Sequence, residues 1–268
     1  AYGDSIRELS WGVGEIMSEI KDLGLDERTL VLFTSDNGAH LELCNEGGDN
    51  GLFRGGNGNF FEGGLRVPGI VRWPEHIPAG IVNTQVISQM DFFPTFVDIA
   101  KGSIPDDRVI DGQDIRHLLS LADSSDEVNS NSSNHQPLFF YCNARLFAMR
   151  FGNYKLHYRT MPMRNKYYYA ARCGEAGFPY SYYHQGVGCV STRVRWHYPP
   201  LIYNLATDPA EAYPLNATLH QDLLQDVESA FTAHEMNLVK GPALFTSFSN
   251  STIPCCDVSN HGCSCNYP

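Results

Sequence analysis

The apolar run at residues 29–34 (TLVLFT) constrains the fold of this chain more than any other segment. It is short and carries no charge, which fits a strand that is covered on both faces in an α/β sheet. Residues 4–24, which precede it, place apolar side chains at the spacing of an amphipathic helix that ends at Gly24. A helix followed by a buried strand is the arrangement of a layered α/β domain.

Three further segments organise the first part of the chain. Residues 66–73 (RVPGIVRW) have the composition of a strand, and their proline places it at an edge or a bulge. Residues 91–101 open with an aspartate and carry a proline in the first turn, which predicts a helix. Residues 121–135 are polar and low in complexity. We therefore predict a domain boundary there, between one unit over residues 1–125 and another over residues 136–268.

The second unit is predicted to be rich in strands. Residues 137–141 and 146–158 have strand composition, and the Gly-Asn pair at 152–153 is typical of a hairpin turn. Residues 200–205 predict a further strand. A helix over residues 217–238 follows, with one face that is expected to be buried. That face consists of Leu219, Leu223, Val227, Ala230, Phe231 and Leu238.

The acidic balance of the chain limits its partners. The formal net charge is −11, which argues against nucleic acid because phosphates require clustered Lys and Arg. No run of about 18 apolar residues occurs, so no segment is expected to span a membrane. The chain opens with Ala-Tyr-Gly-Asp rather than with an initiator methionine or a signal segment. We therefore expect it to be a piece of something longer.

Eight cysteines and three N-x-S/T sequons indicate an oxidising compartment, and hence the secretory pathway. Four of the cysteines form a C-C-x6-C-x-C cluster in a polar tail. Zinc ligands usually come in CxxC-like pairs, so adjacent cysteines favour two interleaved disulfides over a zinc site. The sequons, which are candidate glycosylation sites, are at Asn131, Asn216 and Asn250.

The sharpest chemical signal is the pair Asp36-Asn37, which follows the apolar run almost directly. The ends of sheet strands are where α/β enzymes collect ligands from separate segments. A carboxylate beside an amide offers hard oxygens, which suit Ca²⁺ or Mg²⁺, yet calcium takes about six to eight ligands and the others must come from elsewhere. Asp-Asn-Gly is also the composition of a plain turn, and the residues alone leave both interpretations open.

The wider pattern resembles one protein family. The segments TLVLFTSDNGAH and NGLFRGGNGNFFEGGLRVPGIVRWP resemble the sulfatases, in particular the steryl-sulfatase and arylsulfatase branch. The same resemblance continues in order through QMDFFPTFVDIA, DRVIDGQDI, FFYCNARLFAMR, PPLIYNLATDPAEAYPL and the cysteine-rich tail. It covers nearly the whole chain.

The resemblance implies an α/β fold: the C-terminal part of an alkaline-phosphatase-like sulfatase domain, followed by a smaller α+β unit with an antiparallel sheet. It also implies calcium-dependent hydrolysis of sulfate esters, of the aryl or steryl sulfate class. In such enzymes the nucleophile is a formylglycine made from the cysteine of a C-x-P-S-R motif. None of the eight cysteines stands in that motif. We therefore expect the nucleophile and the rest of the metal site in an upstream part of the same sulfatase, and no activity from this chain alone.

By the same resemblance, Asp36 and Asn37 match metal ligands and would hold a cation that polarises the sulfate. The family has a lysine in G-G-K a few residues before E-G-G, and this sequence has Asn57 there. Asn57 can donate a hydrogen bond to the sulfate but carries no charge. His40 could face the sulfate or bond to a backbone carbonyl, and Arg54 could replace the lysine or serve the structure.

The family pattern also suggests three disulfides, and it leaves Cys44 and Cys173 either free or bonded to each other. The suggested pairs are Cys142 with Cys189, Cys255 with Cys263, and Cys256 with Cys265.

Competing functions follow from these residues. The Asp36-Asn37 pair favours an enzyme, whereas Asn57 favours a catalytically inactive sulfatase-like protein with a binding or structural role. Phosphate-ester chemistry on the same fold ranks last, because GGLRVPGIVRWP is sulfatase-like. The strand at residues 29–34 also needs neighbours upstream, so the isolated chain is expected to expose apolar surface.

Overall fold

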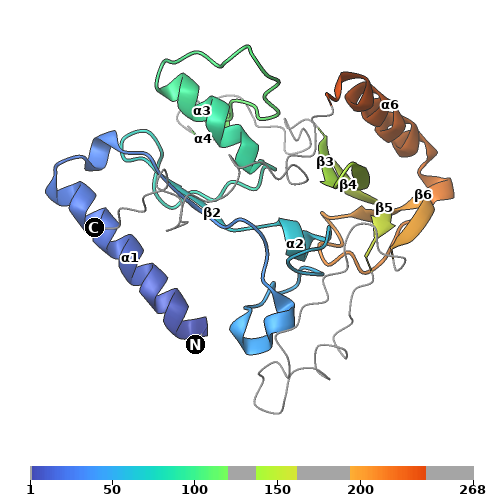
Figure 1. Ribbon diagram of the computed structural model, residues 1–268, viewed down its shortest axis with the longest axis horizontal. Helices are drawn as coiled ribbons and strands as arrows, with labels where there is room; N and C mark the ends of the chain where they lie inside the picture. Colours follow the sequence, from blue (N-terminus) through green and yellow to red (C-terminus); the bar gives the residue numbers. More distant parts are fainter. Residues whose placement is uncertain (1, 120–136, 162–193, 240–268) are drawn as a thin grey trace, which may run out of the picture. The chain divides into compact units, whose positions relative to one another are not determined.

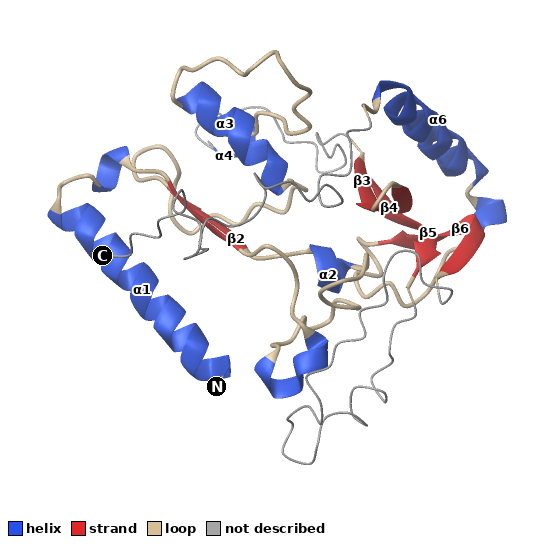
Figure 2. Ribbon diagram, viewed as in Figure 1, coloured by secondary structure: helices blue, strands red, loops and turns tan. Residues whose placement is uncertain are grey.

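The computed structural model describes residues 2–119, 137–161 and 194–239 (Figures 1 and 2). By compactness the chain divides into two units, residues 1–224 and residues 225–268. The boundary predicted at residues 121–135 lies outside the described ranges, so it stays a prediction. No helix within those ranges combines the length and the apolar character needed to cross a membrane.

Helix α1 (Tyr2–Asp22) confirms the predicted amphipathic helix. It ends in a Schellman arrangement, in which Leu25 donates its amide to Ile20 O at 2.9 Å and Gly24 donates its amide to Lys21 O at 2.9 Å. Gly24 has φ 66°, a conformation that glycine adopts without strain. No residue of α1 is buried. Its exposed apolar side chains include Ile6, Leu9, Ile16 and Leu23.

Strand β1 (Val31–Thr34) pairs antiparallel with β2 (Gly69–Arg72), which begins directly after Pro68. Helices α3 (Phe92–Ile99) and α4 (Arg116–Leu119) contribute a hydrophobic cluster that packs against this pair. β1 is half-buried along its length rather than covered on both faces as predicted, and this cluster packs on it at Leu32. The cluster consists of Phe92, Ile115 and Leu118, with Leu32 and Val71 packed against them.

A buried aspartate organises the loops around α3. Asp91 precedes the helix and has no exposed surface, and its carboxylate accepts the amides of Ser88 at 2.6 Å and Gln113 at 2.9 Å. Thr95 donates its hydroxyl to the Asp91 carbonyl at 2.6 Å and accepts the amide of Ile115 at 3.0 Å. These bonds hold the segment before α4 against the first turn of α3.

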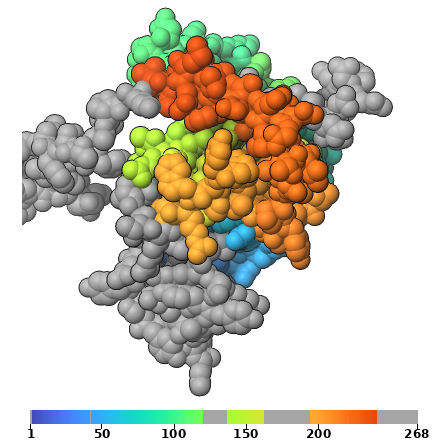
Figure 3. Space-filling model, turned by 90° about the vertical axis from the view of Figure 1, so that its right-hand side faces the viewer, coloured from blue at the N-terminus to red at the C-terminus, as the bar shows by residue number. Residues whose placement is uncertain are grey.

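The second sheet has four antiparallel strands in the order β3-β4-β5-β6. The hairpin between β4 and β5 turns at Gly152-Asn153 as predicted, with Gly152 at φ 54°. β6 forms one edge of the sheet and is orange in Figure 3. The strands are β3 (Leu138–Cys142), β4 (Arg145–Phe151), β5 (Tyr154–Thr160) and β6 (Arg195–Asn204).

The two faces of this sheet differ in chemistry. Residues that are paired across strands share a face. One face carries Lys155 and His157 in the middle of β5, flanked by their partners on the neighbouring strands. The opposite face carries the fully buried row Met149, Leu156 and Ile202. The buried charged side chains of β5 therefore lie on one side of the sheet.

Helix α6 (Gln221–Asn237) begins later than the prediction of 217–238. The residues before it form a separate 3₁₀ turn, Ala217–Leu219. Asn216 caps this turn, because its side-chain oxygen accepts the amide of Thr218 at 3.0 Å.

The buried face predicted for this helix is correct only in its centre. Val227 is 2% exposed, whereas Leu219 is 78% exposed because it precedes α6. Leu238 is also exposed, since it lies beyond the end of the helix. The other three predicted residues are half-buried: Leu223, Ala230 and Phe231.

Candidate functional site

Asp36 and Asn37 lie in the bend that follows β1. Ser35 donates its hydroxyl to the Asn37 carbonyl at 3.1 Å, and the side-chain amide of Gln89 donates to the Ser35 carbonyl. Asp36 is exposed, and Asn37 is half-buried. The backbone of the bend is therefore held by hydrogen bonds while the Asp36 carboxylate remains open to a ligand.

A glycine-rich segment, residues 50–64, closes against this bend. Gly38 donates its amide to Gly64 O at 3.1 Å, and Asn57 donates its amide to Ala39 O at 2.9 Å. A Cβ atom on Gly38 would overlap the carbonyl of Gly63, so only glycine permits this approach.

Asn50 adds a side-chain link between the same two loops. Its Oδ1 accepts the amide of Ala39 at 2.8 Å, and its Nδ2 donates to Gly55 O at 2.8 Å. One amide side chain thus satisfies a donor on the bend and an acceptor on the glycine-rich segment. Both loops are fixed together, which is a requirement for any ligand that contacts both.

The residues predicted for the site come from these two loops. Asn57 is exposed on the segment whose backbone bonds to Ala39, two positions after Asn37. His40 follows Ala39 and is half-buried, with its amide donated to Gly47 O at 3.0 Å. The backbone therefore brings Asn57 and His40 to the same bend as the proposed metal ligands.

The oxygen donors of the bend fit part of a calcium site. An exposed carboxylate beside an amide would supply two of the about six to eight oxygen ligands that calcium takes. Among the residues that the structure describes, no group of three or more His, Cys, Asp and Glu side chains could hold a metal ion. The bend therefore supplies part of such a site, and further oxygen ligands would be needed to complete it.

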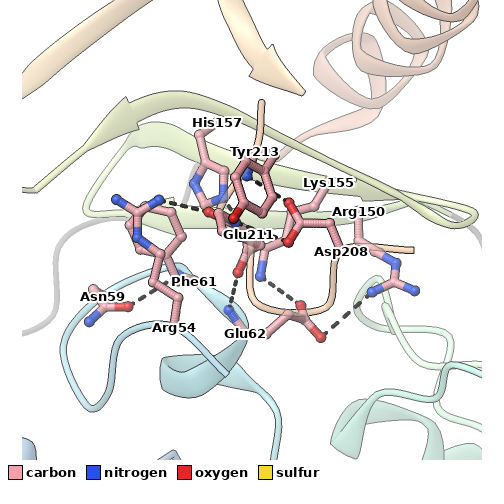
Figure 4. Close-up of polar contacts among 11 residues, drawn as sticks. Arg54, Asn59, Phe61, Glu62, Arg150, Lys155, His157, Asp208, Glu211 and Tyr213 are labelled. Atoms are coloured by element: carbon pink, nitrogen blue, oxygen red, sulfur yellow. Dashed lines mark hydrogen bonds and ion pairs between the residues drawn. The ribbon is translucent and has the colours of Figure 1, made fainter. Parts of the chain in front are cut away.

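A second set of charged side chains meets at the end of the glycine-rich segment (Figure 4), and no local sequence pattern predicts it. Glu62 begins the short helical turn α2 (Glu62–Leu65) and is 8% exposed. Lys155 Nζ lies 2.8 Å from Glu62 Oε1, and Arg150 Nη1 lies 3.6 Å from Glu62 Oε2. Lys155 has no exposed surface. The Glu62–Lys155 contact is thus a buried, charge-assisted hydrogen bond.

Glu211 joins this set to the glycine-rich segment a second time. Its Oε2 accepts the backbone amide of Glu62 at 2.6 Å, and its Oε1 lies 2.7 Å from His157 Nε2. Glu211 and His157 have no exposed surface. We call Glu62, Arg150, Lys155, His157 and Glu211 the buried cluster.

The turn that carries Glu211 holds it in an uncommon conformation. Glu211 has φ 51°, in the left-handed region, which costs a residue with a side chain roughly 1–2 kcal/mol. The Asp208 carboxylate accepts the amides of Ala212 at 3.1 Å and Tyr213 at 2.8 Å. These bonds stabilise the turn and so offset part of the cost of aiming Glu211 at the sheet.

The charge states in the buried cluster follow from burial and neighbouring groups. Burial lowers the pKa of His157, and the opposing effect of its hydrogen bond to Glu211 does not cancel this. His157 Nδ1 has no hydrogen-bond partner in the described part of the chain, which fits a neutral ring that donates from Nε2 to Glu211. Burial also opposes ionisation of Glu62, but Lys155 and the nearby arginines outweigh it and lower the pKa of the Glu62 carboxyl.

Arg54 serves the structure rather than replacing the family lysine. Its guanidinium lies 4.1 Å from the centroid of the Phe61 ring, and its Nη1 donates to Glu211 O at 2.8 Å. Phe61 is buried with Tyr203 and Leu205 of the second sheet and its following turn. The Arg54 guanidinium therefore points toward the buried cluster (Figure 4), where Phe61 and the Glu211 carbonyl bind it.

The cysteines and sequons lie mostly outside the described residues. Cys44 and Cys142 are both disulfide-bonded, so Cys44 is not free. Asn216 is exposed, as a glycosylation site requires. The suggested pairings and glycans stay predictions, because the other residues involved are not described: Cys173, Cys189, Cys255, Cys256, Cys263, Cys265, Asn131 and Asn250.

Comparison with known proteins gives the class to which this fold and site belong. Residues 1–103 match the sulfatase family, and residues 133–265 match the C-terminal region of aryl-sulfatase. The chain belongs to the sulfatase family, and the α/β fold that the sequence predicts is confirmed.

Individual relatives show how much of such a protein the chain covers. An arylsulfatase from Hemicentrotus pulcherrimus is 40% identical over 266 residues, which are 99% of this chain and 46% of that protein. A steryl-sulfatase from Mus musculus is 39% identical over 259 residues, with 90% and 38% covered. The structure of a sulfatase from Pseudoalteromonas sp. has a TM-score of 0.65 at 24% identity and covers 87% of this chain and 42% of that one. The chain thus spans less than half the length of these relatives.

Proposed function

We propose that this chain is the C-terminal part of a calcium-dependent sulfate ester hydrolase of the aryl or steryl sulfate class. Its similarity to an arylsulfatase and a steryl-sulfatase supports this chemistry. The observation that carries the proposal is the pair of backbone hydrogen bonds that set the glycine-rich segment, with Asn57, against the bend of Asp36 and Asn37. The formylglycine nucleophile would come from an upstream part of the same protein, since no cysteine here stands in C-x-P-S-R.

Each residue of the site has a distinct role in this proposal. Asp36 and Asn37 would hold calcium through their side-chain oxygens. A cation in that position supplies positive charge that polarises the sulfate and stabilises its oxygens. Asn57 would donate a hydrogen bond from its side-chain amide to a sulfate oxygen, and His40 would border the same site.

Asn57 supports a second candidate, a catalytically inactive sulfatase-like protein with a binding or structural role. Loss of one preorganised donor to the reacting group commonly costs about 10²–10³ in rate. Arg54 does not restore the missing charge, because its guanidinium is committed to Phe61 and Glu211. The two candidates therefore differ in whether an uncharged donor at residue 57 suffices.

We place the protein in the secretory pathway, in the lumen of the endoplasmic reticulum, Golgi or lysosome, or outside the cell. The disulfide-bonded states of Cys44 and Cys142 support an oxidising compartment. Its partners there would be a sulfate-ester small molecule and the upstream part of the same sulfatase.

Hydrolysis of 4-methylumbelliferyl sulfate tests the proposal. The full-length protein would be co-expressed with the formylglycine-generating enzyme, alongside Asn57→Lys and Asp36→Ala variants. We expect wild-type hydrolysis that calcium chelation and Asp36→Ala both abolish. Activity only in Asn57→Lys would support the inactive sulfatase-like protein instead. If neither wild type nor Asn57→Lys hydrolyses the substrate, although both are folded and carry formylglycine, the result would count against a hydrolase of aryl sulfates.

A further inference from the structure

The buried cluster connects parts of the chain that are far apart in sequence. Glu62 is 93 residues from Lys155 and 149 residues from Glu211. We propose that Glu211 is a positioning residue for the site, which holds the backbone of Glu62 and through it the bend that carries Asp36 and Asn37. This inference rests on the proposed function, because it assigns Glu211 to the proposed calcium loop.

The connection runs through three consecutive residues of the glycine-rich segment. The amide of Glu62 is donated to Glu211 Oε2 at 2.6 Å. The amide of Gly63 is donated to Arg54 O at 2.8 Å, and the carbonyl of Gly64 accepts the amide of Gly38 at 3.1 Å. Each of these hydrogen bonds is made by a backbone group of residues 62–64. A displacement of the backbone at residue 62 would therefore also displace the backbone at Gly38.

Arg54 bonds both to the glycine-rich segment and to Glu211. Its carbonyl accepts the amide of Gly63, while its guanidinium donates to the carbonyl of Glu211. Glu211 thus holds the glycine-rich segment at two points, by its carboxylate at Glu62 and by its backbone at Arg54 (Figure 4). Two points of attachment fix both the position and the orientation of the turn between them.

Filling of space alone does not explain a glutamate at this position. A buried ion or buried polar group is costly unless every bond is made, and apolar side chains of similar volume commonly stabilise a core as well or better. Glu211 is also held in the left-handed backbone region. A carboxylate offers what an apolar side chain does not: two acceptors with fixed directions, here used for the Glu62 amide and for His157. Strained residues that the surroundings hold in place are typical of functional regions.

Three variants of the full-length protein separate positioning from general stability. Glu211→Gln keeps an acceptor for the Glu62 amide, whereas Glu211→Met has similar length and no acceptor. Leu156→Ala is the matched control. Leu156 is fully buried, but it lies on the face of β5 opposite the buried cluster. Two readouts are recorded: hydrogen exchange at the amides of Gly38 and Asn57, and the calcium Kd from calorimetry.

We expect Glu211→Met to raise exchange at both amides and to raise the calcium Kd about tenfold, near the lower end of what loss of an outer partner costs a metal site. Glu211→Gln should stay within about threefold of wild type, because a neutral acceptor loses only part of a charged hydrogen bond. Leu156→Ala should lower the denaturation midpoint while leaving the Kd and the exchange of these two amides close to wild type.

Each outcome decides between the assignments. Unchanged exchange and Kd in Glu211→Met, or equal effects in Leu156→Ala, would overturn the positioning role and leave the cluster as a stabilising element only. If wild type binds no calcium but Glu211→Met still speeds exchange at Gly38, positioning stands and the calcium assignment of the proposed function fails. Should Glu211→Met not fold, Arg54→Met removes the other attachment and must shift the same amides in the same direction, or the inference is wrong.

Discussion

Removal of the Lys155 ammonium should destabilise the protein far more than loss of a surface charge would. Lys155 is fully buried and its Nζ lies 2.8 Å from Glu62 Oε1. Lys155→Met keeps most of the apolar stem but leaves the buried Glu62 carboxylate with Arg150 at 3.6 Å. Removing one partner of a buried pair commonly costs about 3–5 kcal/mol, and because Arg150 remains, we expect about 3 kcal/mol.

A second variant distinguishes an unpaired charge from lost packing. Glu62→Gln combined with Lys155→Met removes both charges, and we expect it to be more stable than Lys155→Met alone. Leu156→Met is the control on the neighbouring residue, since a volume-conserving apolar change usually costs less than about 1.5 kcal/mol.

Urea unfolding of the three variants and wild type at neutral pH, followed by circular dichroism, supplies the free energies of unfolding. Exposed ion pairs contribute less than about 1 kcal/mol to the free energy of unfolding. A loss of that size in Lys155→Met would therefore refute the reasoning. A double variant no more stable than Lys155→Met would show that the carboxylate is not the cause.

Two further predictions concern pH and the loop contact. Because burial lowers the pKa of His157, the unfolded chain takes up a proton below about pH 6.5 that the folded protein excludes. The free energy of unfolding should therefore be highest above that pH and fall as the pH drops below it. The fall should be smaller in His157→Gln. Equal pH dependence of the two free energies, measured by urea titrations, would contradict this. Gly38→Ala should cost about 1–3 kcal/mol, because its Cβ overlaps the Gly63 carbonyl and forces the loops apart. An unchanged thermal midpoint for Gly38→Ala would show that the loops yield freely.

The local elements were accessible from the sequence because local rules govern them. The hairpin at Gly152-Asn153 and the helix that ends at Gly24 follow from residues that permit a left-handed backbone at a chain turn. The same rules failed at Leu219, whose apolar spacing fits the helix although Asn216 caps a separate turn before it. Spacing predicts a face, but a competing cap decides where the helix begins.

The buried cluster was not accessible in the same way. Strand β5 alternates Lys155, His157 and Arg159 with tyrosines and Leu156, a pattern typical of one solvated and one buried face. The structure instead buries Lys155 and His157, because the glycine-rich segment brings Glu62 onto that face. Nothing local to β5 predicts a partner 93 residues away. The Asp36-Asn37 bend could be singled out because a strand end and two oxygen donors are adjacent in sequence, whereas its role as a metal site rests on the family resemblance and stays a prediction.

The 149-residue separation between Glu62 and Glu211 has a consequence for biosynthesis. A ribosome adds about 5–20 residues per second, so the glycine-rich segment emerges roughly 7–30 seconds before the carboxylate that supports it. During that interval the backbone amide of Glu62 lacks the acceptor that Glu211 provides. A premature stop codon between Glu62 and Glu211 would yield a product that keeps every residue of this chain proposed to bind calcium or sulfate. That product would lack the Glu211 carboxylate that holds the glycine-rich segment. Termination between Glu62 and Asp208 is therefore expected to impair the site even though Asp36, Asn37 and Asn57 are all present.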